Sequence, residues 1–242
     1  MKLDTFQDAL CLIVDEDNAP IFCIIFAMIK NVCFDFNGTI LNDVDLTLEL
    51  ENELLEESGR PRIPMDFYLD HFGFPVRDYY LLIGFDFKDI SYDELNAEFM
   101  KRYLEREASE SSLYEGFREC AEKLKAAGIG LYCLSASRQD ILESQLKRLG
   151  IYDLFDGIIG AKDIEAKSKI EYGKEYFLGH GIKPEETLML GDTIHDYEVA
   201  KAIGLKPAFF TSGHCSKKRL SKYDVPQFED YGRFCDYVIS KD

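Results

Sequence analysis

The sequence predicts an α/β protein in which a parallel sheet is covered by helices. From Ile29 onward, short apolar runs alternate with amphipathic segments, as expected for parallel strands joined by helices. The stretch from 44 to 112 breaks this alternation, so we expect a mostly helical insertion after the first strand. With 242 residues, the chain can form one large domain or a core domain that carries an insertion.

Six short apolar runs are predicted strands. In chain order they are Ile29–Phe36, Leu131–Leu134, Gly157–Ala161, Thr187–Leu190, Pro207–Phe210 and Tyr237–Ile239. Two helices between them have an apolar face, formed by Tyr114, Phe117, Ala121, Leu124 and Ala127 in one and by Leu142, Leu146 and Leu149 in the other. Gly128 and Gly150 follow their last turns, where a left-handed C-cap favours glycine.

The insertion contains two predicted helices, Leu46–Leu55 and Ser91–Leu104. Between them, residues 61–87 are dense in aromatic and turn-forming residues. We therefore expect a core made of residues 28–43 and 113–242, with residues 44–112 as a helical unit inserted into it.

Residues 1–27 are expected to be an extension without catalytic residues, because the core pattern is complete from Met28. The apolar run Ala19–Ile29 has 11 residues, whereas a membrane-spanning helix needs about 20. Acidic residues precede it, the opposite of the basic start of a signal peptide. We expect neither export nor a membrane span.

The composition excludes some partners and favours others. A formal net charge of −17 would repel nucleic acid, and no basic stripe offsets it. Small anions would be repelled as well, unless a metal ion and local cations correct the field at a site. The seven cysteines show no CxxC spacing, and Cys33 and Cys133 lie in apolar runs where free cysteine behaves as a buried hydrophobe. A reducing cytoplasm is the expected location.

Asp35 follows the first predicted strand and opens the segment Asp35-Phe36-Asn37-Gly38-Thr39. Ligands of open parallel sheets bind at the carboxyl ends of the strands, so this carboxylate can meet a metal ion and a phosphorus atom together. A carboxylate nucleophile would split phosphoryl transfer into two steps. For this segment alone, an ordinary aspartate in a strand-to-helix turn is the competing interpretation.

A second acidic motif, Gly191-Asp192-Thr193-Ile194-His195-Asp196, follows the predicted strand Thr187–Leu190. Two carboxylates four positions apart and just past a strand end can share one hard cation through oxygen ligands. Helix capping also explains an aspartate here, so the motif is informative mainly in combination with Asp35.

Two further signals are weak when taken singly. Ser135 follows the predicted strand Leu131–Leu134, and its hydroxyl with the next backbone N–H groups, beginning at Ala136, could bind a small anion. A helix N-cap is the competing interpretation of Ser135. Lys167 or Lys169 could balance the negative charge around a phosphorylated aspartate, although each could equally be a solvated surface charge.

In this order, the four segments resemble the four motifs of the haloacid dehalogenase-like superfamily: DxDxT, a strand-end Ser or Thr, a Lys, and GDxxxD. The resemblance extends from about Met28 to the C-terminus, and residues 44–112 match the helical cap of that family. The layout is similar to that of phosphoglycolate phosphatase-like members. The resemblance implies a Rossmann-like sheet and a Mg²⁺-dependent phosphatase that acts on a small phosphorylated metabolite through an aspartyl-phosphate.

The resemblance also implies a metal site. Asp35 would be both the nucleophile and a Mg²⁺ ligand, and Asn37 would add its backbone carbonyl. Asp192 would be the other protein ligand, with Asp196 in support.

For the substrate, the resemblance implies that Ser135 binds the transferring phosphoryl group and that Lys169 pairs with this group and with Asp35. Lys169 is preferred to Lys167 because the lysine of the family opens the following helix. Thr39 and Ala136 are further expected substrate contacts. In the cap, Arg77 is the main basic candidate, with an ordinary surface arginine as the alternative.

Asn37 departs from the family pattern, because most phosphatases of the family have a second aspartate there. That aspartate protonates the leaving oxygen and then activates water, and an amide can do neither. Acid–base catalysis is worth about 10²–10⁴ in rate, so we expect phosphate and Mg²⁺ binding with slow turnover. His195 is the nearby side chain with a suitable pKa, although an exposed loop histidine is the competing interpretation.

The alternative function is a non-catalytic phosphate-binding or regulatory protein of the same superfamily. Asn37 favours it, whereas the retained Asp35, Asp192, Asp196 and lysine argue against it. Dehalogenase chemistry suits the Gly-Thr loop and a Mg²⁺ site less well than phosphate chemistry does. A receiver domain would lack the long insertion and the late GDxxxD motif.

Overall fold

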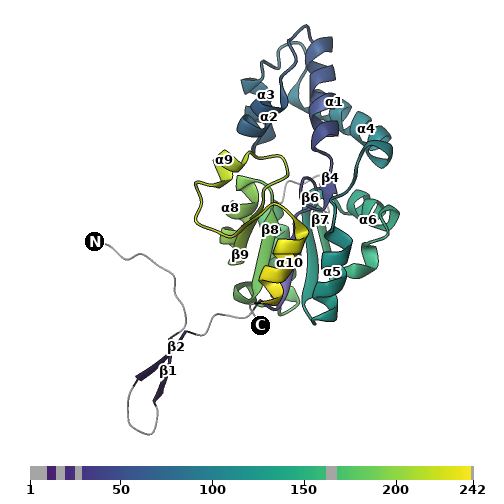
Figure 1. The fold of residues 1–242 in the computed structure, drawn as a ribbon. Coiled ribbons are helices and arrows are strands. Elements are labelled where there is room, and N and C mark those ends of the chain that lie inside the picture. The colour runs from purple at the N-terminus through teal and green to yellow at the C-terminus, as the bar shows by residue number, and fades with distance from the viewer. Residues whose placement is uncertain (1–9, 15–19, 25–28, 162–167, 241–242) are drawn as a thin grey trace, which may run out of the picture.

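The protein is represented by a computed structural model that describes residues 10–14, 20–24, 29–161 and 168–240. Its centre is a six-stranded parallel sheet, which confirms the predicted fold class (Figure 1). From one edge to the other the strands are β10 (Gln227–Phe228), β9 (Lys206–Phe210), β8 (Thr187–Gly191), β3 (Asn31–Phe34), β6 (Gly130–Arg138) and β7 (Gly157–Ala161). The chain enters at β3 in the middle, runs to β6 and β7 on one side, and then returns to β8 on the other. Such a reversal is where open α/β sheets bind ligands.

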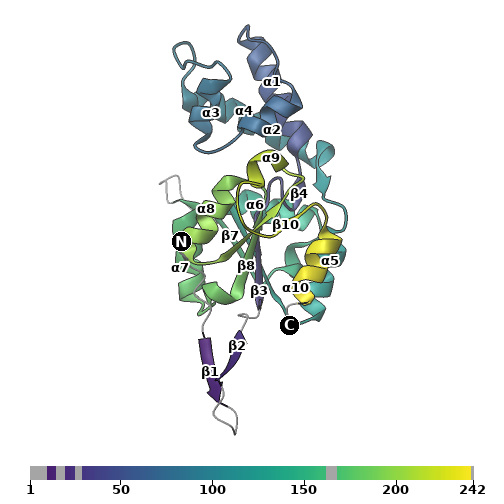
Figure 2. The same ribbon diagram turned by 60° about the vertical axis from the view of Figure 1, so that its left-hand side comes forward.

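Side chains along β3 alternate between two apolar layers, as the two-residue period of a strand requires. Val32 and Phe34 belong to the apolar cluster on one face, and Cys33 belongs to the cluster on the other. The first face is covered by α5 (Phe117–Ala126), α6 (Gln139–Arg148) and α10 (Tyr231–Ile239), and the second by α7 (Lys169–Gly179) and α8 (Ile194–Ile203). Figure 2 shows α5 and α10 on the opposite side of the sheet from α7 and α8.

Four helices lie between β4 (Leu41–Asn42) and β5 (Ser112–Leu113), two short strands that pair antiparallel. We call these helices the cap: α1 (Val44–Glu57), α2 (Met65–His71), α3 (Val76–Leu82) and α4 (Tyr92–Glu110). Helix α1 contains the predicted helix Leu46–Leu55, and α4 contains the predicted helix Ser91–Leu104 except for Ser91, which is its N-cap. Helices α2 and α3 fall in the aromatic-rich part of the insertion. The cap has its own apolar cluster and lies beyond one end of the sheet (Figures 1 and 2).

Shorter elements complete the described chain. They are the 3₁₀ turns Tyr152–Leu154 and Pro184–Glu186, the four-residue helix α9 (Lys217–Leu220), and the antiparallel pair β1 (Leu10–Val14) and β2 (Pro20–Ile24). Strands β1 and β2 form a separate two-stranded sheet. No helix among the described residues is long and apolar enough to cross a membrane.

Two sequence-based predictions are wrong in detail. Tyr237–Ile239 is the last turn of α10 rather than a strand, and the sixth strand is the two-residue β10. Strand β6 continues to Arg138 through an irregularity after Leu134, and α6 begins at Gln139. Ser135 therefore neither opens nor caps a helix, because its neighbours still follow the strand.

Candidate active site

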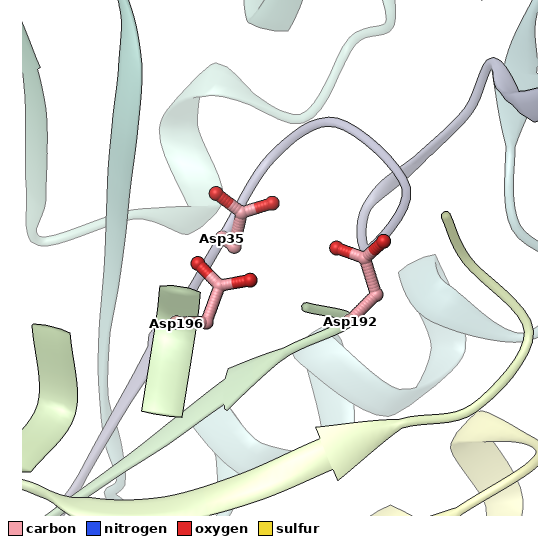
Figure 3. A group of neighbouring side chains, drawn as sticks. All are labelled: Asp35, Asp192 and Asp196. Atoms are coloured by element: carbon pink, nitrogen blue, oxygen red, sulfur yellow. The ribbon is translucent and has the colours of Figure 1, made fainter. Parts of the chain in front are cut away.

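The carboxyl ends of β3 and β8 bring together three aspartates that are distant in sequence. Asp35 directly follows β3, Asp192 directly follows β8, and Asp196 lies in the first turn of α8. One carboxylate oxygen of each lies within 4.8 Å of the other two, and all three side chains are buried. Figure 3 shows the carboxylates gathered under the loop that follows β3. The fold thus joins the two acidic motifs that the sequence indicated.

Lys169 lies between two of these carboxylates. It is the first residue of α7, and its Nζ lies 2.5 Å from Asp35 Oδ1 and 2.6 Å from Asp196 Oδ1. Burial alone would lower the pKa of Lys169, but the charges of Asp196 and Asp35 outweigh it and raise that pKa. Lys169 is therefore a cation at the position expected of the site lysine. Lys167, the other candidate, lies outside the described residues.

The three carboxylates carry more negative charge than Lys169 can balance. The pKa of Asp35 is raised to about 8, chiefly by burial; the charges of Asp196 and Asp192 add to the rise, and Lys169 opposes it. Burial likewise raises the pKa of Asp192 to about 6. Because carboxylate oxygens are the ligands that hard divalent cations prefer, a second cation would relieve this repulsion. The donor set therefore fits an ion such as Mg²⁺.

Asp192 is held rigidly by the two segments around it. Thr39 Oγ1 donates to Asp192 Oδ1 at 3.0 Å, and the backbone N–H of His214 donates to Asp192 Oδ2 at 2.6 Å. A Cβ on Gly38 or Gly213 would lie 2.4 or 2.3 Å from Asp192 Oδ2, so both positions require glycine. Thr39 is fully buried and does not line the cavity described below. The expected substrate contact of Thr39 is thus corrected to a contact with Asp192.

Ser135 and Ala136 lie across the site, on β6. Ser135 is buried, and its Oγ accepts a hydrogen bond of 3.1 Å from the backbone N–H of Ser137. The Oγ of Ser137 donates to Asn37 Oδ1 at 3.3 Å. Ser135 and Ala136 line the same cavity as Asp35 and Lys169, where a phosphate group could reach all four.

The side chain of Asn37 is occupied by neighbours that the sequence did not single out. Its Nδ2 donates to Asp43 Oδ2 and to the hydroxyl oxygen of Tyr103, each at 2.8 Å. Tyr103 in turn donates to Asp43 Oδ2 at 2.6 Å. Asp43 is buried at the start of α1, and Tyr103 comes from α4, so the cap and the core share this contact.

His214 extends this network. Its Nε2 lies 3.3 Å from Asp43 Oδ1, and its Nδ1 lies 2.7 Å from the hydroxyl of Tyr68 in α2. Burial alone would lower the pKa of His214, but the hydrogen bond and charge of Asp43, together with Asp192, raise it to about 9. Because His214 follows β9, the strand-end argument that located Asp192 would also have located it. Nothing in the local sequence marks Tyr68 or Tyr103.

Two other candidates lie on α3 and α8, and of the two His195 lines the cavity. Arg77 is exposed, with its guanidinium 5.3 Å from the ring centre of Phe87, and it does not line the cavity. The expectation that Arg77 faces the substrate is therefore wrong. His195 is half-buried in α8 under Phe74, with ring centres 4.6 Å apart, and burial lowers its pKa. It is not the exposed loop histidine of the competing interpretation.

A cavity of about 480 Å³ lies between the aspartate cluster and the cap. Its floor includes Asp35, Lys169 and Ser135, and its roof consists of residues from α1, α3 and α4 and from the loop between α2 and α3. Pockets of this size enclose small organic molecules. A small ligand could therefore place one charged group on the floor and the rest of its structure against the cap.

The sheet, the aspartate–lysine cluster and the cap define a Rossmann-like α/β protein with an acidic site beneath a helical cap. The sequence model of the haloacid dehalogenase-like hydrolases matches residues 32–210, and the chain belongs to this family. The chain is 25% identical to a phosphoglycolate phosphatase of Thiobacillus denitrificans over 206 residues, covering 81% of this chain and 89% of the relative. It is 26% identical to the pyrophosphatase PpaX of Halalkalibacterium halodurans over 184 residues, covering 74% and 82%.

Solved structures of the same family have a similar fold. A haloacid dehalogenase-like family hydrolase from Streptococcus pneumoniae superposes with a TM-score of 0.70 at 20% identity, over 87% of this chain and 98% of the other. The predicted class, a haloacid dehalogenase-like hydrolase whose relatives are phosphatases of the phosphoglycolate phosphatase type, is confirmed.

Proposed function

We propose that the protein hydrolyses the phosphate monoester of a small organic molecule, with Asp35 as the nucleophile. The observation that carries this proposal is the buried cluster of Asp35, Asp192, Asp196 and Lys169 beneath the cavity. A divalent cation such as Mg²⁺ would be held by the three aspartates and by the backbone carbonyl of Asn37. The phosphatases among the relatives support the same reaction class.

The reaction proceeds in two displacements at phosphorus. An oxygen of Asp35 attacks phosphorus, the bond to the ester oxygen breaks, and the leaving alkoxide takes a proton from solvent water, because Asn37 cannot donate one. Water then attacks the aspartyl-phosphate, which releases inorganic phosphate and restores Asp35. Ser135 and Lys169 bind the phosphoryl oxygens, and Lys169 also orients Asp35. A bound divalent cation would supply charge neutralisation for the phosphoryl group.

The same proposal gives each segment of the chain a role. Residues 28–43 and 113–242 form the catalytic core, and residues 44–112 form a cap that limits access to it. Residues 1–27 contribute no catalytic group. A cytoplasmic location suits this assignment, because the five described cysteines are buried and free, with Cys33 and Cys133 packed in the two apolar layers as predicted.

The first prediction tests the nucleophile. Hydrolysis of p-nitrophenyl phosphate should require Mg²⁺, and Asp35→Asn should lower kcat by at least about 10³-fold, because this carboxylate forms the covalent intermediate. p-Nitrophenolate needs little protonation, so the assay does not depend on Asn37. Asp45→Asn, at an exposed position of α1, is the matched control and should retain full activity.

Two results would contradict the proposal. Full activity in Asp35→Asn would exclude it as the nucleophile. If the unmodified protein binds Mg²⁺ and phosphate but hydrolyses no ester, it is the non-catalytic phosphate-binding protein that Asn37 would allow.

A further inference from the structure

The roof of the cavity is apolar where it faces away from the aspartates. Six cap side chains provide this surface: Phe72, Phe74, Val76, Tyr80, Phe99 and Met100. They come from α3, α4 and the loop between α2 and α3, so they form one continuous wall rather than a single helix face. Apolar and aromatic walls of this kind bind the uncharged part of a ligand.

The cap residues that line the cavity include no lysine, arginine or histidine. The cap arginines are engaged elsewhere: Arg60 and Arg77 lie over aromatic rings, and Arg62, Arg102 and Arg106 pair with glutamates of the cap. Beside this wall the cap contributes one carboxylate to the cavity lining among the described residues, that of Glu51, which accepts a hydrogen bond of 2.8 Å from Tyr79. A carboxylate on the ligand would therefore meet no cation from the cap.

The described cations on the core side are already balanced. Lys169 lies between Asp35 and Asp196, and His214 lies beside Asp43. Arg138 lines the rim, where both of its hydrogen-bonded nitrogens contact the carboxylate of Asp140. A second anionic group on the substrate would compete with one of these carboxylates for its cation.

We propose that the substrate is a phosphate monoester whose organic part is uncharged and apolar, with an aromatic ring or a branched alkyl group, and that esters with a distal carboxylate are disfavoured. This inference rests on the proposed function, because it takes the aspartate cluster as the phosphate site. The apolar wall then receives the alcohol part. The preference would separate this chain from those relatives that are named for phosphoglycolate.

The test compares 4-methylbenzyl phosphate with 4-carboxybenzyl phosphate, whose ester bonds are closely alike and whose distal groups differ in charge. We expect kcat/KM, from release of inorganic phosphate in Mg²⁺, to favour the methyl compound by at least about tenfold. Phosphoglycolate should be a still poorer substrate. Equal or better use of 4-carboxybenzyl phosphate or of phosphoglycolate would overturn the inference.

A charge introduced into the wall should weaken the preference. Met100→Lys places an ammonium on the cavity side of α4, and Asn96→Lys does so one turn earlier if the first variant folds poorly. Either variant should lower the ratio of kcat/KM for the methyl compound to that for the carboxylate compound by at least about fivefold. The reason is that the new ammonium can pair with the carboxylate of the substrate. Leu104→Lys, at an exposed position of the same helix outside the cavity, should leave the ratio unchanged. An unchanged ratio in both cavity variants would also overturn the inference.

The same experiment separates this inference from the proposed function. If neither benzyl phosphate nor p-nitrophenyl phosphate is hydrolysed, the proposed function fails. Calorimetric binding of the two benzyl phosphates in Mg²⁺ then decides the inference by itself. Tighter binding of the methyl compound would support it, and tighter or equal binding of the carboxylate compound would overturn it.

Discussion

The amide of Asn37 is fixed by two hydrogen bonds instead of being free to turn toward a substrate. Both are donated by Nδ2, one to Asp43 and one to Tyr103. A buried carboxylate thus lies beside the position where the family usually has an acid–base aspartate. An aspartate at position 37 would face Asp43 at the distance of a hydrogen bond, and two carboxylates so close cannot both ionise easily.

This contact limits the gain that the single substitution Asn37→Asp can give. An exchange, Asn37→Asp with Asp43→Asn, keeps one carboxylate and one amide in the pair, and Tyr103 can then donate to the new aspartate. We expect the exchange to raise kcat for an alkyl phosphate by at least about tenfold, a cautious part of the 10²–10⁴ that acid–base groups supply. The single Asn37→Asp variant should gain less, and p-nitrophenyl phosphate should respond weakly to both. Separate kcat and KM values on one alkyl and one aryl ester check this.

Asp43→Asn alone is the control, because it alters the pair without placing a carboxylate at position 37. It should give no gain in kcat on the alkyl ester. If Asn37→Asp alone exceeds the exchange, Asp43 itself contributes to catalysis. If neither variant raises kcat, Asn37 is not the limiting defect.

The strands could be predicted from sequence where they are continuous apolar runs, and this located β7 with correct bounds and β8 and β9 within one residue. The edge strand β10 has two residues, too few to show a pattern. Tyr237–Ile239 resembles a strand in sequence because it is a short apolar run. It is in fact the end of an amphipathic helix whose buried positions include Phe234, Cys235 and Val238. A short apolar run does not separate the end of a helix from a strand.

Only part of the candidate site could be predicted from the sequence. The aspartates and Lys169 could be predicted, because strand ends and helix starts bring motif residues to one edge of a parallel sheet. The roof could not, since Tyr103 and the apolar wall reach the cavity through the packing of the cap helices on one another and on the core. The charge of Arg77 favours a contact with the substrate, whereas in the fold its guanidinium lies over the ring of Phe87.

Within α1, Glu51 makes the stability of the cap depend on pH. Burial raises the pKa of Glu51 to about 8; the hydrogen bond from Tyr79 and the charge of His214 lower it only in part. Because this folded-state pKa lies above the ordinary value of 4.5, its contribution is fully present below pH 4.5 and is lost as the pH rises toward 8. The slope is at most about 1.4 kcal/mol per pH unit.

Glu51→Gln should remove this dependence, since its amide oxygen can still accept the hydrogen bond from Tyr79. The free energy of unfolding in urea should rise in the variant relative to the unmodified protein as the pH goes from 5 to 8. Glu105→Gln, at an exposed position of α4, should show no such trend. A constant difference for Glu51→Gln over this pH range would mean that Glu51 is ionised in the folded protein.

The cap contacts the core at other places besides the β4–β5 connection. The backbone N–H of Ser216 donates to the carbonyl of Leu69 at 3.0 Å, and Arg219 Nη1 donates to the carbonyl of Phe72 at 2.5 Å. These contacts tie the segment around α9 to α2 and to the loop after it. Together with the pair formed by Tyr68 and His214, they hold the apolar roof over the aspartate cluster.

The last prediction concerns the N-terminal extension at the same scale. Strands β1 and β2 pair with each other, and the central sheet begins at Asn31, so the catalytic fold should not need residues 1–27. A protein that starts at Met28 should be soluble and retain Mg²⁺-dependent hydrolysis of p-nitrophenyl phosphate. Its Tm should fall by less than about 4 °C, which corresponds to ~1 kcal/mol for a chain of this size.

A protein that starts at Asn31 is the matched comparison for this truncation. It also loses the buried side chain of Ile29 and the hydrogen bond from the Lys30 N–H to the Glu186 carbonyl, which is 2.8 Å long. Thermal unfolding should therefore show a larger loss of stability for the start at Asn31 than for the start at Met28, because the first removes core contacts. If the protein that starts at Met28 is insoluble or loses most of its activity, the extension is part of the folded enzyme and the core begins earlier than Met28.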